Sequence, residues 1–108
     1  RITFAGIKSA TTCIAGPGRY PTSYHLQWEA AKGRSMRPRK IFYNVYEATT
    51  RGGENFSKPT YTTDPGVTSF DTPKLTNEGT YYFVVRARDK AGHEDSNTVE
   101  REGQNLCE

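Results

Sequence analysis

Few residues in this chain of 108 are of types that could carry out chemistry, and they are widely spaced. An enzyme requires a nucleophile beside a base, a carboxylate pair, a metal cage or a cofactor-binding loop. The two imidazoles, His25 and His93, are not obviously paired with a nucleophile, and most of the twelve carboxylates stand singly. Neither glycine-rich phosphate motif, G-x-G-x-x-G or G-x₄-G-K-[ST], occurs. The sequence therefore predicts a protein without catalytic activity and without a cofactor.

A metal site is the next possibility, and one acidic segment offers oxygen ligands for calcium. The side chains concerned are Asp89, Glu94, Asp95 and Asn97. They lack the D-x-D-x-D-G spacing of a dedicated loop, and Asp and Asn in turns also bond their own backbone. Zinc is not indicated, because the cysteines and histidines lack C-x₂-C and H-x₃-H spacing. We therefore expect turn stabilisation here, and no metal.

Positive charge is concentrated between residues 32 and 40. Residues 1–40 carry a net charge of +7, whereas residues 41–108 carry −4. Such a cluster is compatible with an anion site for lipid headgroups, acidic polysaccharide or nucleic acid, and neutralisation by the acidic segment and plain solubility are the alternative explanations. No aromatic residue is interleaved and no nucleic-acid motif occurs, so specific nucleic-acid binding is not expected. The candidate anion loop comprises Lys32, Arg34, Arg37, Arg39 and Lys40.

The elements that must position these residues are short strands. Ten glycines and six prolines leave no uninterrupted run longer than the 13 residues from Arg39 to Arg51. Aromatic and β-branched residues alternate with polar ones at a period of two, which predicts strands. The chain is long enough for one core only, so residues 1–108 form a single domain. The predicted fold is all-β, an immunoglobulin-like sandwich of seven antiparallel strands. These segments are Thr3–Ala10, Tyr24–Glu29, Ile41–Tyr46, Thr60–Thr63, Val67–Asp71, Tyr81–Arg88 and Asn97–Arg101.

The two cysteines, Cys13 and Cys107, stand near opposite ends of this domain. In a seven-stranded sandwich, the turn after the first strand and the exit from the last strand lie at the same pole. A disulfide is therefore compatible with the geometry, and two unrelated thiols are the alternative. A bridge closing so long a loop contributes roughly 4–5 kcal/mol in the chain-entropy model. The bridge predicts an oxidising compartment, which places the protein outside the cell or at the cell surface.

Several stretches match the pattern of a known family. The matching residues are Trp28, Tyr43-Asn44-Val45-Tyr46 and Leu75-x₅-Tyr81-x-Phe83-x-Val85-x-Ala87. Over nearly its whole length the chain resembles the fibronectin type III domain. The runs 4–7, 28–31 and 87–97 resemble its bacterial branch, which occurs in secreted and cell-surface proteins. The cysteine pair departs from the family pattern.

The resemblance implies a core and a tyrosine corner. Trp28, Tyr43 and Val45 would be buried, and Leu75 would pack beneath Tyr81, whose hydroxyl would bond to nearby backbone. The expected core is Ile7, Leu26, Trp28, Tyr43, Val45, Phe70, Leu75, Tyr81, Phe83 and Val85.

Alternation also predicts which side chains point outward. If Tyr43 and Val45 point inward, their neighbours point out, and paired strands would gather an exposed aromatic patch. The candidate binding face comprises Phe42, Tyr46, Tyr82, Val84 and Arg86. The alternative is cross-strand stabilisation, with the stems of Arg86 and Arg88 over the rings.

The expected function is that of a non-catalytic module, a spacer or a protein-interaction or adhesion domain, within a larger secreted or cell-surface protein. Its partners would be another protein or neighbouring domains of the same chain, with polysaccharide or polyanion as further possibilities. The alternative is a carbohydrate-binding accessory domain of a secreted polysaccharide-degrading enzyme, because aromatic rings also stack on sugars. Neither Arg-Gly-Asp nor Trp-Ser-x-Trp-Ser occurs, and no apolar run approaches the ~20 residues of a transmembrane segment.

Overall fold

The computed structural model describes residues 2–14, 22–33, 37–75 and 79–107. Within them the chain forms short strands and a single turn of 3₁₀ helix, η1. The strands are β1 (Ile2–Thr3), β2 (Ile7–Thr12), β3 (His25–Trp28), β4 (Lys32–Gly33), β5 (Phe42–Ala48), β6 (Tyr61–Thr62), β7 (Ser69–Asp71), β8 (Tyr82–Arg88), β9 (Glu100–Glu102) and β10 (Gln104–Asn105), and η1 spans Pro38–Lys40. None of the described segments is a helix long and apolar enough to cross a membrane.

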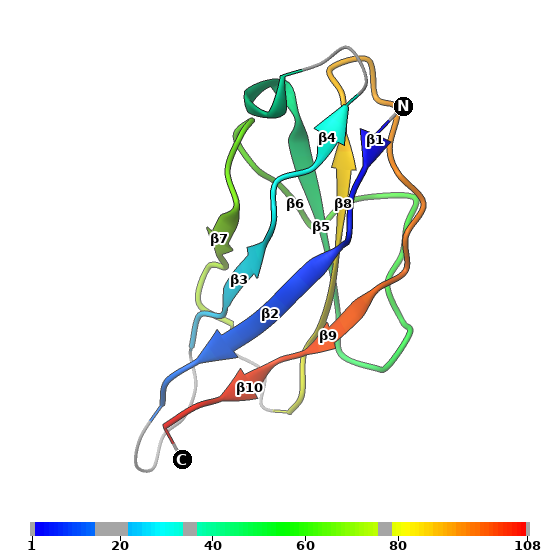
Figure 1. Ribbon diagram of the computed structural model, residues 1–108. Helices are drawn as coiled ribbons and strands as arrows, with labels where there is room; N and C mark the ends of the chain where they lie inside the picture. The colour runs from blue at the N-terminus through cyan, green and yellow to red at the C-terminus, as the bar shows by residue number, and fades with distance from the viewer. Residues whose placement is uncertain (1, 15–21, 34–36, 76–78, 108) are drawn as a thin grey trace.

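Eight of these strands form two four-stranded sheets, in the orders β10-β2-β3-β7 and β6-β5-β8-β9 (Figure 1). The sheets face each other across the core, so the prediction of an all-β sandwich is confirmed. The remaining two, β1 and β4, pair at the end of the sandwich where η1 lies. The described strands are thus more numerous than the seven predicted, and each that overlaps a predicted segment, except β5, is shorter than that segment.

The first predicted strand, Thr3–Ala10, is interrupted at Gly6. This glycine has a φ of +87°, a conformation that other residues rarely adopt. A Cβ at this position would also lie 2.8 Å from the Cβ of Val99. The chain therefore bends at Gly6, so that β1 pairs with β4 while β2 continues into the larger sheet.

The prediction that all strands pair antiparallel is wrong at one place, the C-terminal strand. After β9 pairs with β8, the chain crosses to the other sheet, where β10 runs parallel to β2. The crossing follows Gly103, whose N–H donates to the Tyr81 carbonyl over 2.8 Å. Leu106 N–H then bonds to the Thr12 carbonyl over 2.9 Å, which carries Cys107 toward the end of β2.

The core lies between the two sheets and contains most of the predicted residues. Trp28 and Tyr43 are buried at its centre with ring centroids 5.0 Å apart. The indole donates to the Val67 carbonyl over 3.1 Å, and the Tyr43 hydroxyl accepts the Ala31 N–H over 2.8 Å. The indole N–H and the Tyr43 hydroxyl are thus both hydrogen-bonded, which makes burial of these two side chains favourable. The predicted residues that are buried are Ile7, Leu26, Trp28, Tyr43, Val45, Tyr81, Phe83 and Val85.

Two predicted core residues, Phe70 and Leu75, are only partly buried and pack against the core from its margin. Phe70 lies on β7, an edge strand, and Leu75 pairs with Thr22 in an isolated bridge. Tyr81 is 3% exposed, as the proposed corner requires, but the preceding turn at 76–78 lies outside the described residues. The tyrosine corner therefore stays a prediction.

Candidate functional site

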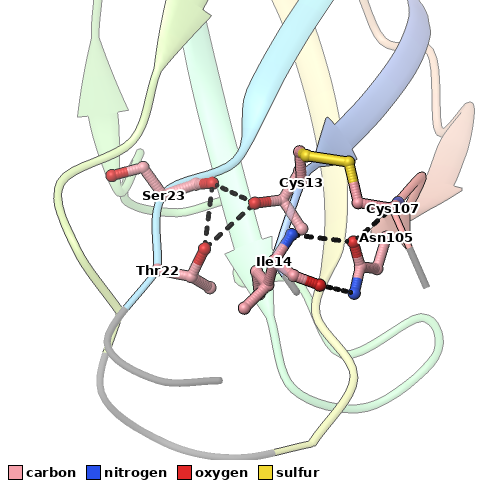
Figure 2. Close-up of a disulfide and its surroundings, with 7 residues drawn as sticks. Cys13, Ile14, Thr22, Ser23, Asn105 and Cys107 are labelled. Atoms are coloured by element: carbon pink, nitrogen blue, oxygen red, sulfur yellow. Dashed lines mark hydrogen bonds between the residues drawn. A yellow bond between two sulfur atoms is a disulfide. The ribbon is translucent and has the colours of Figure 1, made fainter. Parts of the chain in front are cut away.

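The disulfide predicted between Cys13 and Cys107 is present, with the two Cα atoms 4.9 Å apart (Figure 2). Beside it, the Asn105 side chain faces the backbone of Ile14 and bonds both of its polar groups. Asn105 Oδ1 accepts the Ile14 N–H over 3.0 Å, and Nδ2 donates to the Ile14 carbonyl over 2.9 Å. Thr12 Oγ1 adds a bond of 2.8 Å to the Ser23 carbonyl. This pole is therefore closed by covalent and polar links between segments distant in sequence.

The predicted exposed patch on β5 and β8 is wrong in two of its members. Tyr46 is 2% exposed and Val84 is 1% exposed, although both point to the outer side of their sheet. The segment between β5 and β6 returns over this side and sets the Phe56 ring edge-on to Tyr46, with centroids 4.9 Å apart. Outward direction did not mean exposure, because a second layer of chain covers this part of the sheet. Phe42, Tyr82 and Arg86 are half-buried.

A polar cluster also covers the outer side of the sheet at Tyr46. We name it the Glu94 cluster (Glu94, Tyr46, Asn44 and Arg86). The Tyr46 hydroxyl and the Asn44 amide both donate to Glu94 Oε2, the latter over 2.7 Å. Arg86 lies 3.4 Å from Glu94 Oε1 and donates from Nε to the Asn97 carbonyl over 2.8 Å. Burial, and then Glu94, raise the pKa of Tyr46 to about 12, so its hydroxyl remains a donor. The segment after β8 is thereby held against β5.

Arginines cover the rings, as the alternative prediction of cross-strand stabilisation requires. The Arg86 guanidinium lies 5.8 Å from the Tyr46 centroid, and the Arg88 guanidinium lies 4.7 Å from that of Phe42. Arg51, from the segment after β5, lies 5.2 Å over Tyr82. Cation–π contacts of this kind contribute about 0.5–1 kcal/mol each at exposed sites. Arg86 and Arg88 thus lie over Tyr46 and Phe42 as the alternative predicted, whereas the cover of Tyr82 by Arg51 was not predicted.

The acidic segment after β8 stabilises its own turns, as predicted. Asp89 Oδ1 accepts the His93 N–H over 2.8 Å, and this backbone bond is the main cause that lowers the pKa of Asp89. Asp95 accepts from the Ala87 and Asn97 backbone, over 2.6 and 2.8 Å. Across residues 2–14, 22–33, 37–75 and 79–107, no group of three side chains could hold a metal ion.

Both histidines bond to carboxylates on the surface. His25 Nδ1 lies 2.6 Å from Asp71 Oδ1, across the pairing of β3 with β7. His93 Nδ1 lies 3.0 Å from Asp89 Oδ2 within the turn after β8. These contacts link neighbouring chain segments, and we assign them to the surface of the fold.

One carboxyl pair was not predicted, because the acidic residues are scattered along the sequence. Glu54, in the segment between β5 and β6, lies against Glu100 of β9. Burial, and then the interaction with Glu100, raise the pKa of Glu54 to about 7. Glu100 Oε2 in turn accepts the Gly52 N–H over 2.8 Å. The pair links the covering segment to the edge of the sheet.

The candidate anion loop is exposed at every position that the structure describes. Lys32, Arg37, Arg39 and Lys40 are exposed, and Arg34 lies outside the described residues. Among the described side chains, none of these four cations has a carboxylate within 4.0 Å. Direct pairing with the acidic segment, one alternative explanation of the charge, is therefore not observed in that part of the chain.

The backbone of the described residues 37–41, at the C-terminal end of this loop, is held in place by the turn between β6 and β7. Gly66 has a φ of +82°, and its N–H donates to the Ile41 carbonyl over 2.9 Å. A Cβ on Gly66 would lie 2.9 Å from the Arg39 Cα, so only glycine permits this approach. Within η1, the Lys40 N–H bonds to the Arg37 carbonyl over 2.9 Å. Residues 37–40 are thus fixed against the sandwich through Ile41 and Gly66.

A groove of about 480 Å³ brings the two predicted surfaces together, and we name it the cationic groove. Its lining residues are Lys40, Phe42, Pro65, Asp89, Lys90 and Ala91. Phe42 belongs to the predicted binding face and Lys40 to the predicted anion loop. Phe42 pairs with Arg88 across β5 and β8, so Lys40 and Lys90 flank the end of the same strand pair. Nothing in the sequence indicated that Pro65, Lys90 and Ala91 belong to this site, because only the topology brings their turns to it.

No family model, curated protein or solved structure matches this chain. Function is therefore inferred from the geometry of its own residues.

Proposed function

We propose that this chain is a non-catalytic module of a larger secreted or cell-surface protein, serving as a spacer or protein-interaction domain of the fibronectin type III kind. The sandwich with its bridge at one pole is the observation that carries the proposal. Strands β2, β3 and β7 in one sheet, and β5, β6, β8 and β9 in the other, overlap the seven segments that the period-two alternation predicts. The disulfide supports an oxidising compartment, since such bridges persist there.

The shape of the module supports the role of spacer. Its principal extents are 49 × 23 × 18 Å, and β1 and β10 lie toward opposite ends of the long axis (Figure 1). A chain that enters at one pole and leaves at the other separates its neighbours by the length of the module. Strand pairing and one continuous core make that length stiff.

The observations do not favour the carbohydrate-binding alternative. That alternative required open aromatic rings, above all Tyr46 and Tyr82. Tyr46 lies beneath Phe56, and the Arg51 guanidinium covers Tyr82. These two rings do not form an open platform on which a sugar could stack.

The proposal is tested in the native source with an antibody raised against the 108-residue chain. We expect the antigen in the medium or cell-surface fraction, within a polypeptide well above 12.1 kDa. Polyethylene-glycol maleimide reacts with free thiols and increases the apparent mass of a labelled protein. Because Cys13 and Cys107 are bridged, we expect these two thiols to be labelled only after reduction. A 12.1-kDa cytosolic polypeptide with free thiols would contradict the proposal.

A further inference from the structure

We propose that the cationic groove is the docking site for an acidic peptide segment of a protein partner, one that places an apolar side chain between carboxylates. The inference rests on the proposed function, since it names the kind of partner that an interaction module would bind. It begins from the composition of the groove. Phe42, Pro65 and Ala91 supply apolar surface, which we call the floor, and Lys40 and Lys90 supply the cations.

The charge of the groove favours an anionic occupant. Lys40 and Lys90 are exposed, and neither has a carboxylate within 4.0 Å among the described side chains. The one carboxylate of the lining, Asp89, is already engaged by the N–H and the ring nitrogen of His93. Arg39 and Arg37 add positive charge on the adjoining turn. Opposite charges on a partner would therefore accelerate its encounter and fix its register.

The apolar floor distinguishes a peptide from other polyanions. A sulfated or carboxylated polysaccharide presents charge without an apolar side chain to fill the floor. A nucleic acid would stack successive bases on several aromatic faces, whereas Phe42 is the only aromatic residue among the described lining residues. An acidic peptide with one Leu or Phe fits both features, because its side chain covers the floor while its carboxylates reach the two lysines.

Both walls of the groove are pre-organised. The Lys40 wall is seated on Gly66 through the bond from the Gly66 N–H to the Ile41 carbonyl. The Lys90 wall is a tight turn, in which Asp89 N–H bonds to the His93 carbonyl over 3.0 Å and Gly92 N–H bonds back to Asp89 over 3.1 Å. Little ordering is therefore required on binding, so a short peptide should suffice.

The test measures binding of a fluorescein-labelled pentapeptide, Glu-Glu-Phe-Glu-Glu, to the 108-residue chain by fluorescence anisotropy. We expect Lys40→Glu and Lys90→Glu each to weaken binding about tenfold or more, with a steep loss as salt rises from about 0.05 to about 0.3 M. The matched control is Lys74→Glu, which is also exposed and stands next to Leu75, the bridge partner of Thr22. It should bind as the wild type does. The pentapeptide with Ala in place of Phe should bind several-fold more weakly.

Amide chemical shifts supply a second, independent readout. Addition of the peptide should move the resonances of Phe42 and Ala91 while leaving those of Ile14 and Asn105 in place. Equal affinity of Lys40→Glu, Lys90→Glu and Lys74→Glu, or absence of binding, overturns the inference. Tighter binding of heparin, phosphatidylserine vesicles or single-stranded DNA than of the peptide also overturns it. If the peptide does not bind but the antigen is extracellular, the proposal of an extracellular module still stands. If the antigen is cytosolic, that proposal is refuted whether or not the peptide binds.

Discussion

Removing the carboxylate of Glu94 should destabilise the protein far more than removing any exposed carboxylate. Glu94→Ala leaves the Tyr46 hydroxyl, the Asn44 amide and the Arg86 guanidinium without their shared acceptor. The side chains of Arg86 and Glu94 are only 12% and 19% exposed, so water cannot fully replace the lost bonds. Breaking a buried pair by removing one partner costs about 3–5 kcal/mol. For a chain of this length that corresponds to a fall of about 12–20 °C in Tm.

The assay is thermal and urea unfolding at neutral pH with the disulfide intact, followed by circular dichroism and by Trp28 fluorescence. Glu102→Ala is the matched control, because Glu102 pairs with Arg51 at 3.3 Å while their side chains are 48% and 72% exposed. That substitution should cost no more than about 1 kcal/mol. Tyr46→Phe combined with Glu94→Ala should show a coupling energy above about 0.5 kcal/mol. If Glu94→Ala costs as little as the control, the description of this face as covered is refuted.

Three further predictions concern the bridge, a carboxyl pair and a turn. Replacing Cys13 and Cys107 by Ser should cost about 4–5 kcal/mol in urea unfolding, since the bridge spans 94 positions, and a loss below about 1 kcal/mol would contradict this. Between about pH 4.5 and about pH 7 the folded state holds a proton on Glu54 that the unfolded state has released, so stability should fall as pH rises through about 7. We expect a fall of about 1 kcal/mol after allowing for solvent screening, and Glu54→Gln should remove it; an unchanged pH profile would contradict the pairing with Glu100. Gly66→Ala should cost more than about 1 kcal/mol by denaturation, because its φ is positive and backbone lies against it.

The period-two alternation was sufficient to predict the strands that matter most for the core. β3, β5 and β8 fall within the predicted segments or within two residues of them, and Trp28 and Tyr43 are buried as expected. Alternation reports only which side of a sheet a residue occupies. It could not reveal that Phe56 and Glu94 cover the outer side at Tyr46, because both arrive from distant parts of the chain.

The candidate site was predicted in two separate pieces. Phe42 was assigned by strand direction and Lys40 by charge, and each prediction used local sequence alone. Their union in one groove depends on the pairing register of β5 with β8 and on the turn around Pro65. The parallel strand β10 was missed for a similar reason: two residues carry no periodic pattern, and its position is set by contacts with Thr11 and Thr12.

The bridge between Cys13 and Cys107 also determines where tension would travel if neighbouring domains pulled on this one. Load entering before Cys13 and leaving after Cys107 passes through the sulfur–sulfur bond, and the sheets between them carry almost none of it. The sequence separation of 94 between the two cysteines corresponds to roughly 310 Å of extended polypeptide, which cannot be released while the sulfurs are joined. While the bridge is intact, load cannot extend the chain between Cys13 and Cys107, and after reduction only strand pairing and the core would resist that extension.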